Sequence, residues 1–445
     1  MERVAILGSG MAGWGAVHRL HQEGVPSVVY DKNGYFGGHT ASFKHPSGFI
    51  FDEGPHVSFT KHERLQKLFA ESVNDKYEII HARPNNYWKG HWIKHPAICN
   101  LSGLPTDLVV KCLRDFIGAH HDHENSIEPK PIGNYADWLI ASYGKTFAET
   151  FPMEYGFKYH TTTADNMSTA WLGPRLYRAK LEEVLVGALS SETPDVHYVD
   201  YVRYPSYEGF VSYLTFLPER TQINLGHQLI RLDPAAQQLH FANGVVTGYD
   251  AIISSVPLPE LVPMIVGAPP DVVEAAKKLA STSCVMVNLG INRPDLSEGQ
   301  WTYFYDRAIC FTRLSFPHMF SPHTAPPGCG SIQAEVYFSQ KYRPLKGSPD
   351  DYVTPVIADL KRCGVLREDD KILHTNVHVS RYAQVIFDLE RADALMTVHG
   401  YLDDVGVAYC GRYGDWLYIW TDEAFISGEN AAQKTLDRMR VSKSR

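Results

Sequence analysis

The stretch Arg3-Val4-Ala5-Ile6-Leu7-Gly8-Ser9-Gly10-Met11-Ala12-Gly13, almost at the start of the 445-residue chain, decides the fold. Its apolar first half is typical of a buried strand, and residues 14–23 have the apolar spacing of a helix. A second apolar run over residues 27–30 ends at Asp31, where a carboxylate can accept hydrogen bonds from ribose hydroxyls. Strand, glycine turn, helix, strand and acid in this order predict a Rossmann-type dinucleotide-binding unit.

Each glycine of the turn has a separate task in such a unit. Gly8 allows the tight turn, Gly10 lets the backbone approach a pyrophosphate, and Gly13 lets the helix pack closely on the strand. The first turn of the helix also presents free N–H groups and a partial positive charge. We therefore expect Met11 and Ala12, at this helix start, to contact the phosphates together with the glycines.

The loop that follows Asp31 distinguishes FAD from NAD. It reads Lys32-Asn33-Gly34-Tyr35-Phe36-Gly37-Gly38-His39-Thr40 and carries a second glycine pair. Acid and glycine pair together resemble the D/E-x(5)-G-G pattern of amine oxidases, protoporphyrinogen oxidases and UDP-galactopyranose mutases. The resemblance implies FAD as the cofactor, with Lys32, Gly37, Gly38 and His39 along its diphosphate.

The C-terminal segment, residues 406–432, has an apolar run, a Gly-Arg turn and a helix that starts with acidic residues. Four small residues in this helix, Ser427, Gly428, Ala431 and Ala432, would allow close packing against a cofactor or a neighbouring helix. The segment resembles the last FAD motif of the same flavoproteins, strand-G-R-[FY]-G-x-W-x-Y followed by S-G-x-x-A-A. The resemblance implies that FAD is contacted by five residues: Gly411, Arg412, Tyr418, Trp420 and Thr421.

A third part of the same fold is predicted in the middle of the chain. Residues 222–225, 228–232, 238–241 and 248–257 are typical of short strands joined by turns. The resemblance implies a small meander there, in which the backbone of Leu229 pairs with the adenine edge. We therefore predict an α/β protein with a discontinuous Rossmann-type FAD-binding domain and an inserted α+β substrate domain. The predicted FAD-binding domain comprises residues 1–75, 205–290 and 395–445, and the substrate domain comprises residues 76–204, helical in part, and 291–394, richer in strands.

Residues 50–59 contain Gly54-Pro55-His56 and resemble the mutase segment G-[PG]-H-[VI]-x-F, whose histidine lies beside the flavin ring. The resemblance implies that Pro55 and His56 contact the flavin. A His56 pKa near neutrality would let this imidazole follow the redox and protonation state of the flavin.

Other matches to the mutases point toward the substrate. Residues 88–105 are aromatic and basic, and residues 143–175 resemble a mutase pattern that ends in an arginine on the substrate diphosphate. Ser380-Arg381-Tyr382 stands where the mutases direct a tyrosine or arginine at the substrate. The resemblance implies that Arg175 binds a diphosphate, while Tyr382 and Tyr418 line the substrate pocket.

These matches favour an FAD-dependent enzyme similar to UDP-galactopyranose mutases, which interconverts pyranose and furanose sugars of a sugar nucleotide through reduced-flavin N5 chemistry. One departure is that Ile419-Trp420-Thr421 stands where bacterial mutases carry an Asp-Met pair. The alternative is an oxidase or dehydrogenase of the amine oxidase or protoporphyrinogen oxidase type, which removes hydride from a C–N or C–C bond. Many amine oxidases place a lysine near the flavin, and no lysine of this chain stands out for that role. A flavin-binding protein without catalysis is a third alternative.

The composition excludes several other classes of protein. The net charge of −8 lacks the basic excess of a nucleic-acid binder. The seven cysteines form no C-x-x-C pair, so we expect no disulfides and no zinc site. His374 and His378 are four residues apart, but Thr375 and Val377 between them are typical of a strand and not of a helix, so we expect no metal site there. No signal peptide or membrane-length apolar run is evident, which favours a cytoplasmic protein without a transmembrane segment. The expected partners are a small-molecule substrate and an external reductant or oxygen; the sequence leaves open the substrate, the electron donor and whether the chain forms a homo-oligomer.

Overall fold

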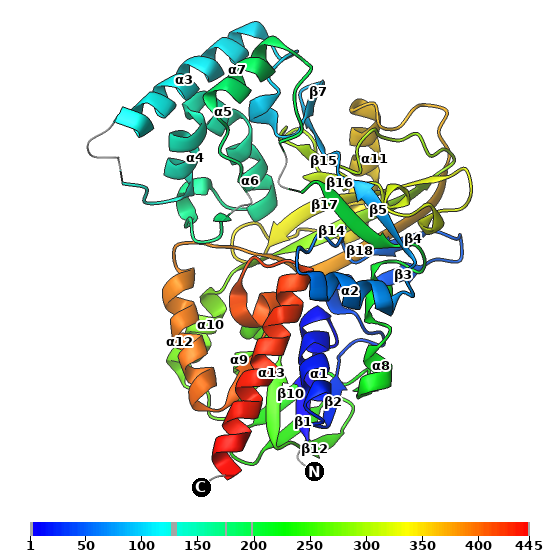
Figure 1. Ribbon diagram of the computed structural model, residues 1–445, viewed down its shortest axis with the longest axis vertical. Coiled ribbons are helices and arrows are strands. Elements are labelled where there is room, and N and C mark those ends of the chain that lie inside the picture. Colours follow the sequence, from blue (N-terminus) through cyan, green and yellow to red (C-terminus); the bar gives the residue numbers. More distant parts are fainter. Residues whose placement is uncertain (1–2, 126–130, 174–175, 197–198, 444–445) are drawn as a thin grey trace.

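The computed structural model describes residues 3–125, 131–173, 176–196 and 199–443. Figure 1 shows a lower half that holds both ends of the chain, and an upper half in which a helical lobe stands beside a large sheet. The described residues contain no helix that combines the length and apolar character needed to cross a bilayer.

A five-stranded parallel sheet forms the core of the lower half (Figure 1). In spatial order its strands are β19 (Val407–Tyr409), β13 (Ala251–Ser254), β1 (Val4–Leu7), β2 (Ser27–Tyr30) and β9 (Gln222–Asn224). Strand β1 is buried along its whole length, as expected for an inner strand of a parallel sheet. Segments from the start, middle and end of the chain therefore build one sheet, which confirms the predicted discontinuous nucleotide fold.

Helix α1 (Met11–Gln22) follows β1 and packs against α13 (Thr421–Lys443), the C-terminal helix (Figure 1). Glycine residues on both helices let the backbones of α1 and α13 approach closely. A Cβ atom on Gly15 would lie 1.9 Å from the carbonyl oxygen of Phe425, and one on Gly428 would lie 1.9 Å from that of Ala12. The small residues predicted in the last helix thus serve helix packing, and they hold the two ends of the chain together.

Smaller elements surround this sheet. Strands β10 (Leu229–Asp233), β11 (Gln238–Phe241) and β12 (Val246–Gly248) form an antiparallel meander, whereas the predicted strands at residues 222–225 and 248–257 belong to the parallel sheet as β9 and β13. The other short strand pairs are the hairpin of β3 (Ser42–Lys44) with β4 (Ile50–Asp52), and β5 (Tyr77–His81) with β8 (Tyr201–Pro205). Besides α1 and α13, this half contains α2 (Glu63–Ser72), α8 (Leu217–Arg220), α9 (Leu258–Met264), α10 (Pro270–Lys278) and α12 (Arg391–Asp404).

A seven-stranded sheet forms one side of the upper half. Its strands in spatial order are β18 (Ile372–Val385), β14 (Ser281–Ile291), β17 (Gly330–Ser339), β16 (Arg313–Ser315), β15 (Trp301–Phe304), β6 (Asn85–Trp88) and β7 (His91–Lys94). Strand β14 pairs with β17 and β18 along its whole length. The predicted boundary at residue 290 would cut this strand, so we propose that the FAD-binding segment ends before residue 281.

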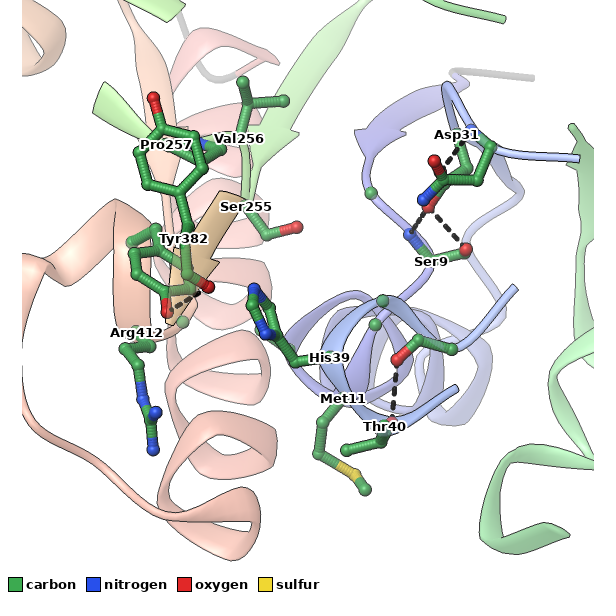
Figure 2. Close-up of a pocket in the computed structure, with 18 of the residues that line it drawn as sticks. Ser9, Met11, Asp31, His39, Thr40, Ser255, Val256, Pro257, Tyr382 and Arg412 are labelled. Atoms are coloured by element: carbon green, nitrogen blue, oxygen red, sulfur yellow. Dashed lines mark hydrogen bonds between the residues drawn. The ribbon is translucent and has the colours of Figure 1, made fainter. Parts of the chain in front are cut away.

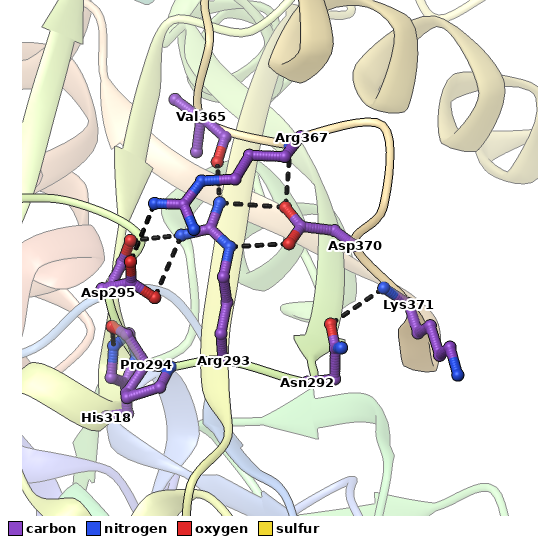
Figure 3. A network of polar contacts seen from close by, with 9 residues as sticks. All are labelled: Asn292, Arg293, Pro294, Asp295, His318, Val365, Arg367, Asp370 and Lys371. Atoms are coloured by element: carbon purple, nitrogen blue, oxygen red, sulfur yellow. Dashed lines mark hydrogen bonds and ion pairs between the residues drawn. The ribbon is translucent and has the colours of Figure 1, made fainter.

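A network of hydrogen bonds and ion pairs lies at the C-terminal end of β14 (Figure 3). The guanidinium of Arg293, just after β14, donates to Asp370 Oδ1 at 2.6 Å and to the carbonyl oxygen of Val365 at 2.9 Å. Arg367 donates to Asp295 at 2.8 Å. These bonds tie the end of β14 to the loop between α11 (Val353–Arg362) and β18. The network therefore holds β14 and β18 together at one end, and the other ends of these two strands carry residues of the cavities.

The helical lobe contains α3 (Thr106–Asn125), α4 (Tyr135–Tyr143), α5 (Lys145–Thr150), α6 (Pro152–His160) and α7 (Leu181–Leu189). Its interior is rich in aromatic side chains that pack on β6 and on the loop after β15. Helix α6 connects this lobe to the sheet, because it also packs against β17 and β14. The lobe thereby contributes side chains to the site described below.

Candidate active site

Two adjoining cavities lie where the lower and upper halves meet. The first has a volume of about 390 Å³ and follows the glycine turn of β1, and the second has a volume of about 190 Å³ and lies under the seven-stranded sheet. Both are lined by His39, Glu53, His56, Ser380, Arg412, Trp420 and Thr421. A ligand that fills the first cavity therefore reaches the wall of the second.

The first cavity is walled largely by backbone. Gly8 and Gly37 line it with φ angles of +103° and +116°, which are open mainly to glycine. The N-terminus of α1 opens into it at Gly10, Met11 and Ala12, and no side chain caps that helix end. Uncapped N–H groups at a helix start are a phosphate site, so this wall fits the diphosphate of FAD.

Asp31 lies at the carboxyl end of β2 on another wall of the first cavity (Figure 2). Its Oδ2 accepts from the Ser9 backbone N–H at 2.8 Å and from the Ser9 hydroxyl at 2.6 Å, while Oδ1 accepts from the Asn33 N–H at 2.9 Å. These donors orient the carboxylate at the place where a ribose is expected. Leu229, Lys32 and Gly38, from which contacts with FAD are predicted, also line this cavity.

The C-terminal motif closes the cavity from the facing side. Gly411 has a φ of +76°, and Arg412 follows it in η9 (Arg412–Trp416). The Arg412 guanidinium donates to the carbonyl oxygen of Ile419 at 3.1 Å and to Gln384 Oε1 at 3.1 Å. Arg412 therefore clips the loop before α13 to the end of β18, and its cationic side chain borders both cavities.

Pro55 and Tyr382 lie elsewhere than expected, and Gly13 and Tyr418 each meet one of the two roles expected of them, helix packing and the substrate pocket. Gly13 lines neither cavity; its added Cβ would lie 2.1 Å from the carbonyl oxygen of Gly8, so it serves helix–strand packing. Pro55 and Tyr418 line the second cavity and not the first. Tyr382 lines the first cavity alone, because it lies in an irregular part of the β18–β14 ladder that turns its side chain away from the substrate side. Arg175 lies outside the described residues.

The electrostatic expectation for His56 needs correction. Burial lowers the pKa of His56 to about 3, although the nearby carbonyl oxygen of Gly54 opposes the shift. Its Nδ1 lies 2.8 Å from that oxygen, so the neutral ring donates from Nδ1 and presents Nε2 as an acceptor. Burial likewise lowers the pKa of His39 to about 4. Both imidazoles at the junction are therefore neutral at physiological pH, and His56 is not poised to titrate near pH 7.

The second cavity is lined by aromatic and charged side chains. Four tyrosines contribute phenol groups: Tyr159, Tyr303, Tyr337 and Tyr418. Burial raises the pKa of the first three, so these phenols stay protonated and act as neutral donors and acceptors. Arg313 pairs in two-pronged fashion with Glu335, with Nη2 2.9 Å from Oε1.

Sequence reasoning missed most of this second set. Arg313, Glu335, Tyr303 and Tyr337 come from three neighbouring strands, and the register that brings their side chains together cannot be read from local sequence. One signal was present, because Glu335 stands in the mostly apolar stretch of residues 332–338 and a buried carboxylate needs a cationic partner. Among the described residues, histidine, cysteine and carboxylate side chains form no group of three that could hold a metal ion.

Comparisons with known proteins agree with this geometry. The family model described as "flavin containing amine oxidoreductase" matches residues 11–436. The crystal structure of reduced UDP-galactopyranose mutase aligns with a TM-score of 0.90 and 24% identity, over 98% of this chain and 96% of that one. A protein of Exiguobacterium sp. 255-15, assigned as a protoporphyrinogen oxidase, aligns with a TM-score of 0.74 and 17% identity, over 98% and 99% of the two chains.

One curated relative has a local match in sequence. The 15-cis-phytoene desaturase of Synechococcus elongatus is 30% identical over 90 residues, which span 20% of this chain and 17% of that protein. The structural likenesses establish the fold, and the family match covers nearly the whole chain. The chain belongs to the flavin-containing amine oxidoreductase family and is an FAD-dependent enzyme.

Proposed function

We propose that this enzyme acts on a sugar nucleotide and interconverts the pyranose and furanose forms of its sugar. The observation that carries this proposal is the second cavity, in which four phenols and an arginine surround a space that borders the flavin site. Protonated phenols both donate to and accept from sugar hydroxyls. At about 190 Å³ the cavity is smaller than the roughly 300–1,000 Å³ typical of drug-sized ligands, so it suits one sugar ring and not a whole nucleotide.

When bound, the reduced flavin supplies a nucleophilic N5 atom toward the anomeric carbon, as the resemblance to the mutases implies. The residues of this chain would bind and orient the sugar. Glu335 engages Nε and Nη2 of Arg313, and Nη1 has no acceptor among the described residues. That N–H group is suited to a phosphate oxygen of the leaving nucleotide. Neutral His56 would border the flavin and keep a fixed ring orientation through Gly54.

The state of Lys158 favours this proposal over an amine oxidase with a flavin-proximal lysine. Lys158 lies on α6 near the second cavity, but its Nζ donates to the carbonyl oxygens of Phe304, Asp306 and Phe311 at 3.0, 3.0 and 2.6 Å. Burial lowers the pKa of Lys158 to about 7, and in the protonated form its three N–H donors are all engaged. The described residues that line either cavity beside the flavin include a single lysine, Lys32, which lies at the ribose end near Asp31.

The test is an anaerobic assay on the purified FAD-loaded protein with UDP-galactopyranose and related sugar nucleotides, with and without dithionite. We expect furanose products, separated by chromatography, in the reduced state alone and without net oxidation of the substrate. Tyr303→Phe should lower the rate, and Tyr207→Phe, which changes a half-exposed phenol outside both cavities, should not. Flavin bleaching by amines followed by recovery in oxygen would instead place the enzyme among the oxidases and overturn the proposal.

A further inference from the structure

Three histidines lie in a layer between the β3–β4 hairpin and strand β18. His374 and His378 are four residues apart on β18, so their side chains share one face of the strand, and His45 comes from the hairpin. The rings of His45 and His374 lie 4.4 Å apart between centroids, and the ring of His378 lies 4.9 Å from that of Phe43. We call His45, His374 and His378 the histidine layer.

Each member of the histidine layer carries a buried nitrogen without a partner. The Nε2 atoms of His45, His374 and His378 are inaccessible to bulk solvent and have no hydrogen-bond partner among the described residues. Buried polar atoms in native proteins are almost always hydrogen-bonded, to ordered water where the protein offers nothing. Three such atoms in one layer therefore mark positions for internal water. Aromatic packing by itself would not require imidazole at these places.

The inner end of the histidine layer meets the flavin site at Glu53. Glu53 lines both cavities, and its Oε2 lies 3.8 Å from His378 Nε2, a gap slightly too long for a direct hydrogen bond. Burial raises the pKa of Glu53, but the contacts with His378, His39 and Ser380 outweigh it and the pKa lies below its ordinary value. The other ionisable groups that face this carboxylate are Tyr35, His56 and Tyr413, with Arg412 beyond His39.

The outer end of the histidine layer reaches solvent. His374 Nδ1 lies 2.9 Å from the hydroxyl of Ser47, an exposed residue in the hairpin turn. Burial lowers the pKa of His374 and of His45, so both rings are neutral at pH 7 and offer one donor and one acceptor nitrogen. The ionisable groups that face His45 and His374 are each other and His378. Such rings can accept a proton at one nitrogen and release one from the other.

We propose that the histidine layer, with internal water between its rings, is a proton path from solvent at Ser47 to Glu53 at the flavin site. Each transfer breaks one N–H or O–H bond and forms another, so one proton moves and no electrons do. Electrons delivered to the cavity by an external reductant need a compensating charge, and a proton that follows this path supplies it. The inference rests on FAD binding and is independent of the sugar substrate.

The test follows electrons and protons separately in the FAD-loaded protein. Pulse radiolysis of formate gives carbon dioxide radical anions, each of which transfers one electron to the flavin and becomes carbon dioxide. Flavin absorbance reports electron arrival, and phenol red in weakly buffered solution reports proton uptake from the medium. We expect uptake to keep pace with reduction in the wild type and to lag by roughly tenfold or more in His378→Phe, within the range for loss of a proton-transfer group.

Further variants separate a path from a merely structural role. His374→Ala removes the ring nearest the surface, so millimolar imidazole should restore fast proton uptake in that variant. His399→Ala removes a half-buried imidazole that stacks on Tyr409 outside both cavities, and it should leave the kinetics unchanged. If His378→Phe does not retain FAD, His378→Gln and Glu53→Gln replace it. Wild-type uptake kinetics in His378→Phe or in His374→Ala, or a lag in His374→Ala that imidazole does not shorten, would overturn the proposal.

Discussion

The two cavities of this enzyme adjoin each other, but the walls of the first are largely main chain and those of the second are largely side chains. The first is walled by glycine turns and the uncapped start of α1, so main-chain conformation and free N–H groups do most of the binding. The second is walled by phenols and by the Arg313–Glu335 pair, which come from strands and helices far apart in the chain. Cofactor binding is therefore a local property of short segments, whereas substrate binding depends on assembly of the whole upper half.

The largest effect that separates the two cavities is expected for Arg313→Met. This change leaves Glu335, whose side chain is 3% exposed, without its cation in the wall of the second cavity. Loss of one partner of a buried ion pair costs about 3–5 kcal/mol of unfolding free energy. Thermal denaturation should show this loss, and the assay with reduced enzyme and a sugar nucleotide should show no product. FAD content should stay near that of the wild type, because the first cavity is untouched.

The double variant Arg313→Met/Glu335→Leu distinguishes stability from binding. Replacing a buried pair by apolar residues is often neutral or stabilising, so the double variant should recover most of the lost stability. It should not recover activity, because no cation remains for the nucleotide phosphate. Activity in either variant would contradict the assignment of Arg313 to substrate binding.

An intermediate effect is expected for Gly428→Ala, which should distort the first cavity and leave the second unchanged. The new Cβ would lie 1.9 Å from the backbone carbonyl of Ala12, so α13 must move away from α1. We expect a loss of about 1–3 kcal/mol in stability, typical of overpacking, together with weaker FAD binding measured by flavin titration of the apoprotein. Gly118→Ala on α3 is the matched control, because nothing lies within 4 Å of its added Cβ.

The same contrast explains what the sequence could predict. Gly8, Gly10, Asp31 and Gly411 stand in short segments whose spacing alone dictates a turn, a helix start or a strand end, so their positions were predictable. The parallel sheet followed from apolar runs at both ends and in the middle of the chain. Such features are written in local sequence and need no knowledge of distant contacts.

The rest depends on register and burial, which local sequence does not report. Tyr382 was expected at the substrate, but a ladder irregularity opposite Thr282 and Cys284 turns it toward the nucleotide cavity. His56 was expected to titrate near neutrality, but burial lowers its pKa to about 3. Arg313 and Glu335 meet because β16 pairs with β17 in one register, and a slip by one residue would turn one of the two side chains to the other face of the sheet.

The effect that is smallest at neutral pH, and that grows only below pH 6.5, is a pH dependence that the imidazoles of His39, His56 and His160 confer on stability. Burial lowers the pKa values of His39, His56 and His160 to about 4, 3 and 3, below the unfolded value near 6.5. The unfolded chain therefore binds more protons as the pH falls below 6.5, so stability is complete above that pH and is lost toward pH 4. Each histidine contributes up to about 1.4 kcal/mol per pH unit to this loss.

His160→Phe removes one of these imidazoles without touching either cavity. The ring is buried beside Trp171 and its Nδ1 has no hydrogen-bond partner among the described residues, so phenylalanine forfeits no known bond. Unfolding by urea at several pH values should give a shallower loss of stability below pH 6.5 than in the wild type. Added FAD should extend the remaining slope to lower pH, because His39 and His56 border its cavity and a bound ligand keeps them unprotonated in the folded protein. An unchanged slope in His160→Phe would mean that this imidazole is protonated in the folded protein, and burial would then not govern its pKa.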